Sequence, residues 1–223
     1  MTKQKTSERI KMLSIMAMLT ALAVVADCYL RIPNIGGFLT YEPKDVIISI
    51  AAFIYNPIAG LIISLVTCLA EIPISKTGPI GLLMNFLSSA TFVGVASVIY
   101  YRKKTILRAV IGLIAGSLAM VAVMLLWNYI MTPIYMGVSR ELVVGMMPTL
   151  LLPFNAIKAG LNSALVLLIY KPLVTALRKS KLIPIRDSND NENKRLNTII
   201  VAVVSALAVA TMILVLLIFA KII

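Results

Sequence analysis

The chain of 223 residues contains no histidine, two cysteines (Cys28 and Cys68) and only 13% charged residues. The lack of histidine excludes Ser-His-Asp and Cys-His catalysis, and with so few cysteines it also excludes His-rich zinc sites and Cys-bound clusters. The sequence has no G-x-x-x-x-G-K-[ST] motif, so any nucleotide that supplies energy must bind to another chain. We therefore expect no metal, no cofactor and no enzymatic activity.

Hydrophobic residues make up 60% of the chain, against about half in soluble proteins. They form several runs of about 18 or more residues, the length that crosses a bilayer as a helix. The sequence predicts an all-α integral membrane protein, with segment 45–55 too short to span alone and separated from the next by Asn56-Pro57. The expected helices are 10–30, 45–55, 57–74, 79–101, 107–131, 153–177 and 197–220.

Lysine and arginine are concentrated in three segments, which predicts the orientation. Residues 3–11, 102–108 and 171–195 hold 15 of the 21 cations. Because short cytoplasmic loops carry the excess of Lys and Arg, we expect a multi-pass protein of the cell membrane with a cytoplasmic N-terminus. The net charge of +12 then reflects topology and contact with the lipid bilayer, and nucleic acid is not an expected partner.

The pattern of runs predicts four regions. Residues 1–9 form a cytoplasmic N-terminus, and 10–178 form a six-helix membrane domain. A polar stretch, 179–196, contains too little apolar surface to order itself and is expected to be a cytoplasmic linker. Residues 197–220 would be an appended seventh helix.

Five polar side chains are expected inside the outer half of the membrane, namely Glu71, Asn85, Asn128, Asn155 and Lys158. A polar group in hydrocarbon is costly unless it is paired or faces a cavity, so each is a functional hypothesis. Clustering on one side indicates a pocket that opens outward. The alternative uses are an Asn bonded to a neighbouring helix and a Lys158 that reaches the headgroups.

Asn155, Lys158 and Asn162 have the spacing i, i+3, i+7, which places them on one helix face. Amides and an ammonium suit a ligand edge rich in carbonyl and ring-nitrogen acceptors. Three outer segments surround this cluster: 29–44, which holds Tyr41 as a further binding candidate, 72–79 and 132–153. Loops of this length over a pocket are candidate lids, although each could be an ordinary connection.

On the first helix, Ala17 and Ala21 form a small-x-x-x-small pair, which allows another helix to approach closely. The helix could be one of this chain or one of a partner.

Several motifs together are similar to a known family. They are Ala17-x-x-x-Ala21, Gly81-Leu-Leu-Met-Asn85-Phe86, Asn128-Tyr129 and Leu152-Pro153-Phe154-Asn155-Ala-Ile-Lys158-Ala-Gly160-Leu-Asn162. Residues 8–178 resemble the substrate-binding S components of energy-coupling factor (ECF) vitamin transporters, and among these the riboflavin-specific members. The chain departs from that plan in its seventh helix and in the Tyr-Glu-Pro-Lys-Asp of the first outer loop.

The resemblance implies that Asn128, Asn155 and Lys158 bind the polar edge or hydroxyl tail of riboflavin and that the first loop closes over it. It also implies that Ala17 and Ala21 contact a transmembrane coupling subunit, which works with an ATPase pair. We add Asn85, Glu71 and Tyr41 as candidate binding residues.

A neutral, flat vitamin needs a few amides and one cation in an apolar pocket, and Lys158 is the one cation expected within the membrane. We therefore do not expect paired charges at this site. Two alternatives stay open, an S component for another vitamin and a secondary transporter of a small molecule. An intramembrane enzyme would need a nucleophile or metal-binding carboxylates, and Asp27, Asp45 and Glu71 do not form a D-x-x-D-like cluster.

Overall fold

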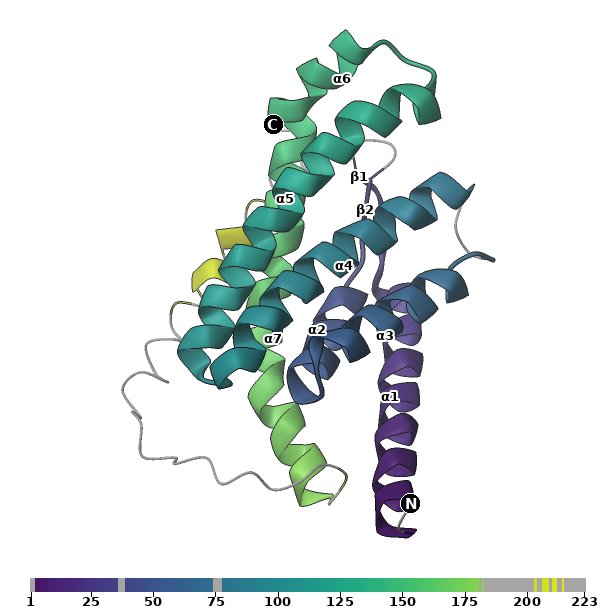
Figure 1. Ribbon diagram of the computed structural model, residues 1–223. Helices are drawn as coiled ribbons and strands as arrows, with labels where there is room; N and C mark the ends of the chain where they lie inside the picture. The colour runs from purple at the N-terminus through teal and green to yellow at the C-terminus, as the bar shows by residue number, and fades with distance from the viewer. Residues whose placement is uncertain are drawn as a thin grey trace.

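The computed structural model describes residues 3–35, 39–73, 78–180 and 182, and seven residues between 203 and 214. Figure 1 shows a bundle of helices with a small two-stranded hairpin, β1–β2, near one end. We call this the hairpin end and the opposite one the α4–α5 turn end. The elements are α1 (Lys3–Leu30), β1 (Ile32–Ile35), β2 (Leu39–Tyr41), α2 (Lys44–Ile54), α3 (Pro57–Ala70), α4 (Gly78–Lys103), α5 (Ile106–Met136), α6 (Arg140–Met146), the π-helical turn η1 (Met147–Leu151) and α7 (Leu152–Lys179).

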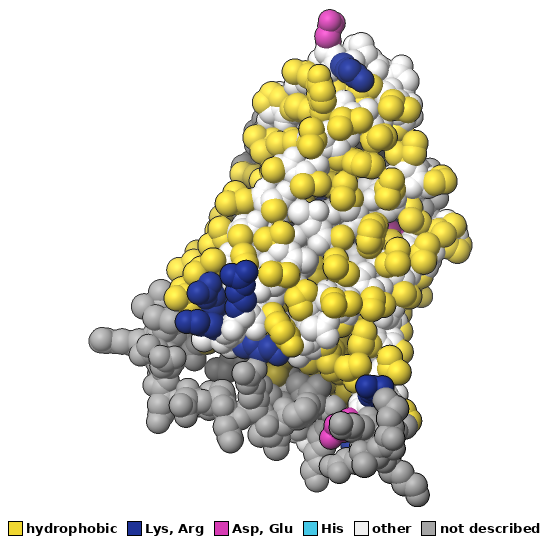
Figure 2. All heavy atoms as spheres, in the orientation of Figure 1, with side chains coloured by type: hydrophobic (Ala, Val, Ile, Leu, Met, Phe, Trp, Pro, Cys, Tyr) yellow, Lys and Arg dark blue, Asp and Glu magenta, His cyan; other side chains and the backbone are white. Residues whose placement is uncertain are grey.

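Four described helical segments are long and apolar enough to cross a membrane: Ser7–Leu30, Gly78–Lys103, Ile106–Met136 and Arg140–Leu177. Apolar side chains cover most of the face in Figure 2, as expected for a surface in contact with lipid tails. The expectation of a helical membrane protein is confirmed.

The short helix α2 lies inside the bundle. Nine of its 11 residues are buried, and it packs against α1, α3, α4 and α7. Helix α2 ends before Asn56-Pro57, as the dipeptide predicted. Asn56 caps the next helix, α3, by accepting a hydrogen bond from the Ala59 amide at 2.8 Å. With 11 and 14 residues, α2 and α3 are each too short to cross a layer about 30 Å thick.

Two expectations about the loops are wrong. Residues 132–153 are not a loop, because α5 continues to Met136 and α6 and η1 follow. Gly137 ends α5 in the left-handed conformation (φ 66°), and the Ser139 hydroxyl caps α6. The first outer loop contains strands β1 and β2, paired antiparallel with Ile32 opposite Tyr41, so the fold is not entirely α-helical.

The predicted count of six helices plus one is not confirmed. The described residues before 180 form seven α-helices, because α6 is an additional short helix. Most of 179–196 and of 197–220 lies outside the described residues. The seven described residues of the latter range are helical, and a Cβ placed on Gly160 of α7 would lie 3.4 Å from the Thr211 methyl group.

Helices α4 and α5 approach each other closely at two glycines. A Cβ on Gly112 would lie 2.6 Å from the Ala96 carbonyl oxygen, and one on Gly116 would lie 2.7 Å from that of Phe92. Backbone atoms cannot move aside as a side chain can, so only glycine fits at these positions. The G-x-x-x-G spacing is the one that brings membrane helices together.

We predict that Gly112→Ala destabilises the protein by about 1–3 kcal/mol, because the added methyl group forces α4 and α5 apart. The measurement is thermal unfolding of the purified protein in detergent. Gly94→Ala is the matched control, since its Cβ would meet only the Leu61 side chain at 3.8 Å. Equal melting temperatures for the two variants would contradict the close contact.

Candidate ligand-binding site

A compact apolar cluster lies at the hairpin end, where β2, α6, η1 and α7 meet. Its buried members are Leu39, Val143, Leu151 and Phe154. Partly buried neighbours add side chains from α4 and α5, including Met84 and Leu125. The elements that contribute are widely separated in sequence, as in a site that several helices build together.

Two of the predicted asparagines lie close to this cluster in sequence. Asn155 follows Phe154 and is buried, and its Nδ2 donates to the Leu151 carbonyl at 2.8 Å. That carbonyl belongs to η1, and π-helical turns occur frequently at functional sites. Asn128 is buried one turn from Leu125; its Nδ2 donates to the Met124 carbonyl at 2.7 Å.

Asn128 and Asn155 can each donate one further hydrogen bond. An amide NH₂ has two donors, and each of these bonds to a backbone carbonyl uses one of them. Asn128 also accepts from the Thr132 hydroxyl at 2.9 Å through Oδ1. The structure does not bring Asn128 or Asn155 into hydrogen-bond contact with the other predicted site residues.

The polar face of α7 is as predicted, since Asn155, Lys158 and Asn162 are all buried. The Tyr41 hydroxyl donates to Asn162 Oδ1 at 3.0 Å, and Asn162 Nδ2 donates to Asp45 Oδ2 at 3.3 Å. The Ser89 hydroxyl also donates to Asp45. A chain of hydrogen bonds thus joins β2, α7, α2 and α4.

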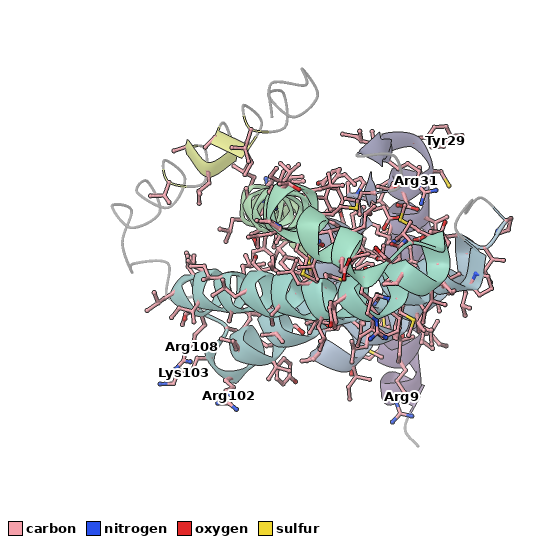
Figure 3. The ribbon with its side chains drawn as sticks, turned by 90° about the horizontal axis from the view of Figure 1, so that it is seen from above. Arg9, Tyr29, Arg31, Arg102, Lys103 and Arg108 are labelled. Atoms are coloured by element: carbon pink, nitrogen blue, oxygen red, sulfur yellow. The ribbon has the colours of Figure 1, made fainter. Side chains whose placement is uncertain are left out.

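A network of buried charges is centred on Glu42, the residue after β2. Arg31 Nη2 lies 3.1 Å from Oε1 of Glu42, and Lys44 Nζ lies 2.8 Å from its Oε2. Asn85 Nδ2 donates to Oε1 at 2.6 Å, and Lys158 Nζ lies 3.7 Å from Oε2. Figure 3 shows Arg31 beside the two strands.

The network continues to two further carboxylates. Glu71 pairs with Lys44 and accepts from Asn85 Nδ2 at 3.2 Å, and Asp27 lies 3.4 Å from Arg31. One carboxylate oxygen each of Asp27, Glu42 and Glu71 lie within 4.8 Å of one another. Because Arg31 and Lys44 lie among them, the arrangement is an ion-pair network.

Two sequence-based expectations are therefore wrong. Paired charges do occur beside the site, and Lys158 is not its one cation, since Lys44 is fully buried in α2. Separately, Asp27 and Glu71 lie close together in space, and Glu42 is the third carboxylate of their cluster. The signal that could have revealed it was the run Tyr41-Glu-Pro-Lys-Asp45 next to the expected outer ends of helices carrying Asp27 and Glu71.

The surrounding charges and burial shift the pKa values of Glu42 and Tyr41. Burial alone would raise the pKa of Glu42, but Lys44, Lys158 and Arg31 outweigh it and hold that pKa at about 2. Glu42 therefore stays ionised. Burial, followed by the negative charge of Asp45, raises the pKa of Tyr41, so its hydroxyl remains a donor.

Comparison with known proteins supports the family predicted from the motifs. The family model described as "ECF transporter, substrate-specific component" matches residues 11–170. This chain belongs to that family. This S component is 32% identical to the chain in "Structure and mechanism of the S component of a bacterial ECF transporter", with a TM-score of 0.65 over 76% of this chain and 99% of that one.

Two curated relatives have names that state their cargo. The S component is 31% identical to "Riboflavin transporter RibU" of Staphylococcus aureus (strain TCH60), over 76% of this chain and 93% of the relative. It is 24% identical to "Riboflavin transporter FmnP" of Bacillus subtilis (strain 168), over 78% of this chain and 99% of the relative. The family is one of transport components rather than enzymes.

The low pKa of Glu42 predicts a loss of stability in acid. A carboxyl whose folded pKa is about 2, against the ordinary 4.5, contributes stability that is complete above about pH 4.5 and is lost as the pH falls toward 2. We predict that the melting temperature falls less steeply between pH 6 and pH 3 in Glu42→Gln than in the wild type. Equal slopes of melting temperature against pH in the two proteins would contradict the prediction that Glu42 is ionised.

Proposed function

We propose that this S component binds riboflavin at the hairpin end and presents it to an ATP-driven module for uptake. The observation that carries the proposal is the burial of Asn128, Asn155 and Lys158 on α5 and α7, the two helices that also contribute Leu125 and Phe154 to the apolar cluster. Both curated relatives, whose names state riboflavin transport, support it.

The chemistry of the site suits a flat ring system with a polar edge. The cluster of Leu39, Leu151 and Phe154 supplies apolar contact for the ring faces. Asn128 and Asn155 can each donate a second N–H, and Lys158 offers three donors to carbonyl or ring-nitrogen acceptors. Tyr41, Asn85 and Glu71 act in this proposal as the supporting polar layer, since they bond to Asn162, Glu42 and Lys44.

The hairpin end is proposed to face the outside, with the N-terminus in the cytoplasm. Arg102, Lys103 and Arg108 lie together at the α4–α5 turn end in Figure 3, and Figure 2 shows basic side chains gathered toward that end. Arg9 belongs to the first turns of α1, which start at the same end. Cytoplasmic loops carry such an excess.

The proposed partners are a transmembrane coupling subunit and its ATPase pair, which supply the energy that this chain cannot. Ala17 and Ala21 are exposed on α1, opposite the buried stripe of Ile15, Leu19 and Ala23. Their exposure argues against internal packing and leaves a flat face that another helix can approach. Residues 10–178 form the substrate-binding domain in this proposal, 179–196 the linker and 197–220 an additional helix.

We predict that Lys158→Met weakens riboflavin binding by about one to two decades, because it removes a charge-assisted hydrogen bond worth about 1.5–3 kcal/mol. Quenching of riboflavin fluorescence by the purified protein measures this affinity. Lys103→Met is the control, since Lys103 is exposed at the far end of α4. Unchanged affinity in Lys158→Met would remove Lys158 from the site. A wild type that ignores riboflavin and binds another vitamin would contradict the substrate.

The partner face gives a separate prediction. Ala17→Trp combined with Ala21→Trp should keep riboflavin affinity within about threefold, since neither alanine contributes to the site. It should prevent co-purification with the coupling subunit and abolish uptake in cells by steric overlap. Ala122→Trp is the control, an exposed alanine on α5. Equal loss of binding and uptake in the double variant would show that α1 packs within this chain at these residues.

A further inference from the structure

Besides its partners in the charged network, Glu42 lies beside Lys158, a candidate ligand-binding residue. We propose that Glu42 is a positioning residue that orients Lys158 for the ligand. The inference rests on the proposed function, because it assigns a role at the same site.

Glu42 ties the hairpin to most of the bundle around the site. Its carboxylate contacts Arg31 between α1 and β1, Lys44 at the start of α2, Asn85 on α4 and Lys158 on α7. The side chain is 1% exposed. A carboxylate so deeply buried is stable only while these partners surround it, so Glu42 is held in one place beside Lys158.

The distance between the Glu42 carboxylate and the Lys158 ammonium leaves Lys158 able to bind a ligand as well. At 3.7 Å, Oε2 is close enough to balance the ammonium but too far to accept a hydrogen bond from it. The three N–H donors of Lys158 therefore stay available for ligand acceptors. Asp45 is near enough to interact electrostatically with Lys158 as well.

Tyr41, the last residue of β2, and Glu42, which follows it, contact α7 at two consecutive turns. Tyr41 donates to Asn162, and Glu42 pairs with Lys158, four residues earlier on the same face. These two contacts fix the position of Lys158 on α7 relative to β2 and the residue after it.

A purely structural role for Glu42 predicts something different, because it would act on affinity independently of Lys158. A double-mutant cycle separates the two roles. The cycle uses the full chain as wild type, Glu42→Gln, Lys158→Met and the double variant, with riboflavin titrated against each. Glu141→Gln, an exposed acid on α6, is the matched control and should bind like the wild type.

We expect Glu42→Gln alone to weaken riboflavin binding about tenfold and the double variant to bind within about threefold of Lys158→Met. Additive losses would overturn the inference, since Glu42 would then not act through Lys158. Unchanged affinity in Glu42→Gln would overturn it too. If Glu42→Gln does not fold, Glu42→Asp, which keeps the charge on a shorter side chain, replaces it in the same cycle.

Trypsin provides a readout that does not depend on the ligand. Arg31 and Lys44 flank the hairpin, and both are held by Glu42. Without riboflavin, Glu42→Gln should be cut after these residues at least several-fold faster than the wild type or Glu141→Gln. Equal rates would show that Glu42 does not hold its partners in place and would overturn its positioning role. Failure of the wild type to bind riboflavin would instead contradict the proposed function, while this assay still tests the hairpin.

Discussion

Charge removed from water must be compensated, and this constraint organises the whole hairpin end. Four carboxylates and two lysines are buried there, beside the partly buried Arg31. Left alone, each would cost several kcal/mol, and together they are stable only in one arrangement. The network therefore fixes how α1, the hairpin, α2, α3, α4 and α7 meet, and the candidate site takes its shape from that meeting.

In the proposed riboflavin site, the apolar and polar parts have different roles. Leu39, Leu151 and Phe154 exclude water and provide contact without direction. The asparagines and Lys158 provide direction, because hydrogen bonds depend on geometry. Burial of Lys158 beside Glu42 strengthens its electrostatic attraction for an acceptor, since the surrounding dielectric is low. Selectivity in such a site comes from a small number of polar atoms.

Much of this could be predicted from the sequence. The long apolar runs located α1, α4, α5 and α7, the Asn56-Pro57 break located α3, and the i, i+3, i+7 spacing placed Asn155, Lys158 and Asn162 on one buried face. Helical periodicity is a local property, so one sequence suffices to detect it. The family followed from motifs that are also local.

The partners of the polar residues could not be predicted, because they are set by tertiary contacts. Glu42 and Asn85 are 43 residues apart, and Tyr41 and Asn162 are 121 apart. Nothing in the local pattern links them. The helix α6 and the turn η1 were missed because a Ser cap and a few apolar residues resemble a loop when their packing is unknown.

The central position of α2 also affects how the chain is made. A helix of 11 residues that starts with Lys44 and Asp45 is a poor substrate for insertion into a bilayer on its own. Two of its counter-charges come later in the chain, Glu71 directly after α3 and Lys158 on α7. The buried charges of α2 are therefore fully compensated only after α7 has been synthesised.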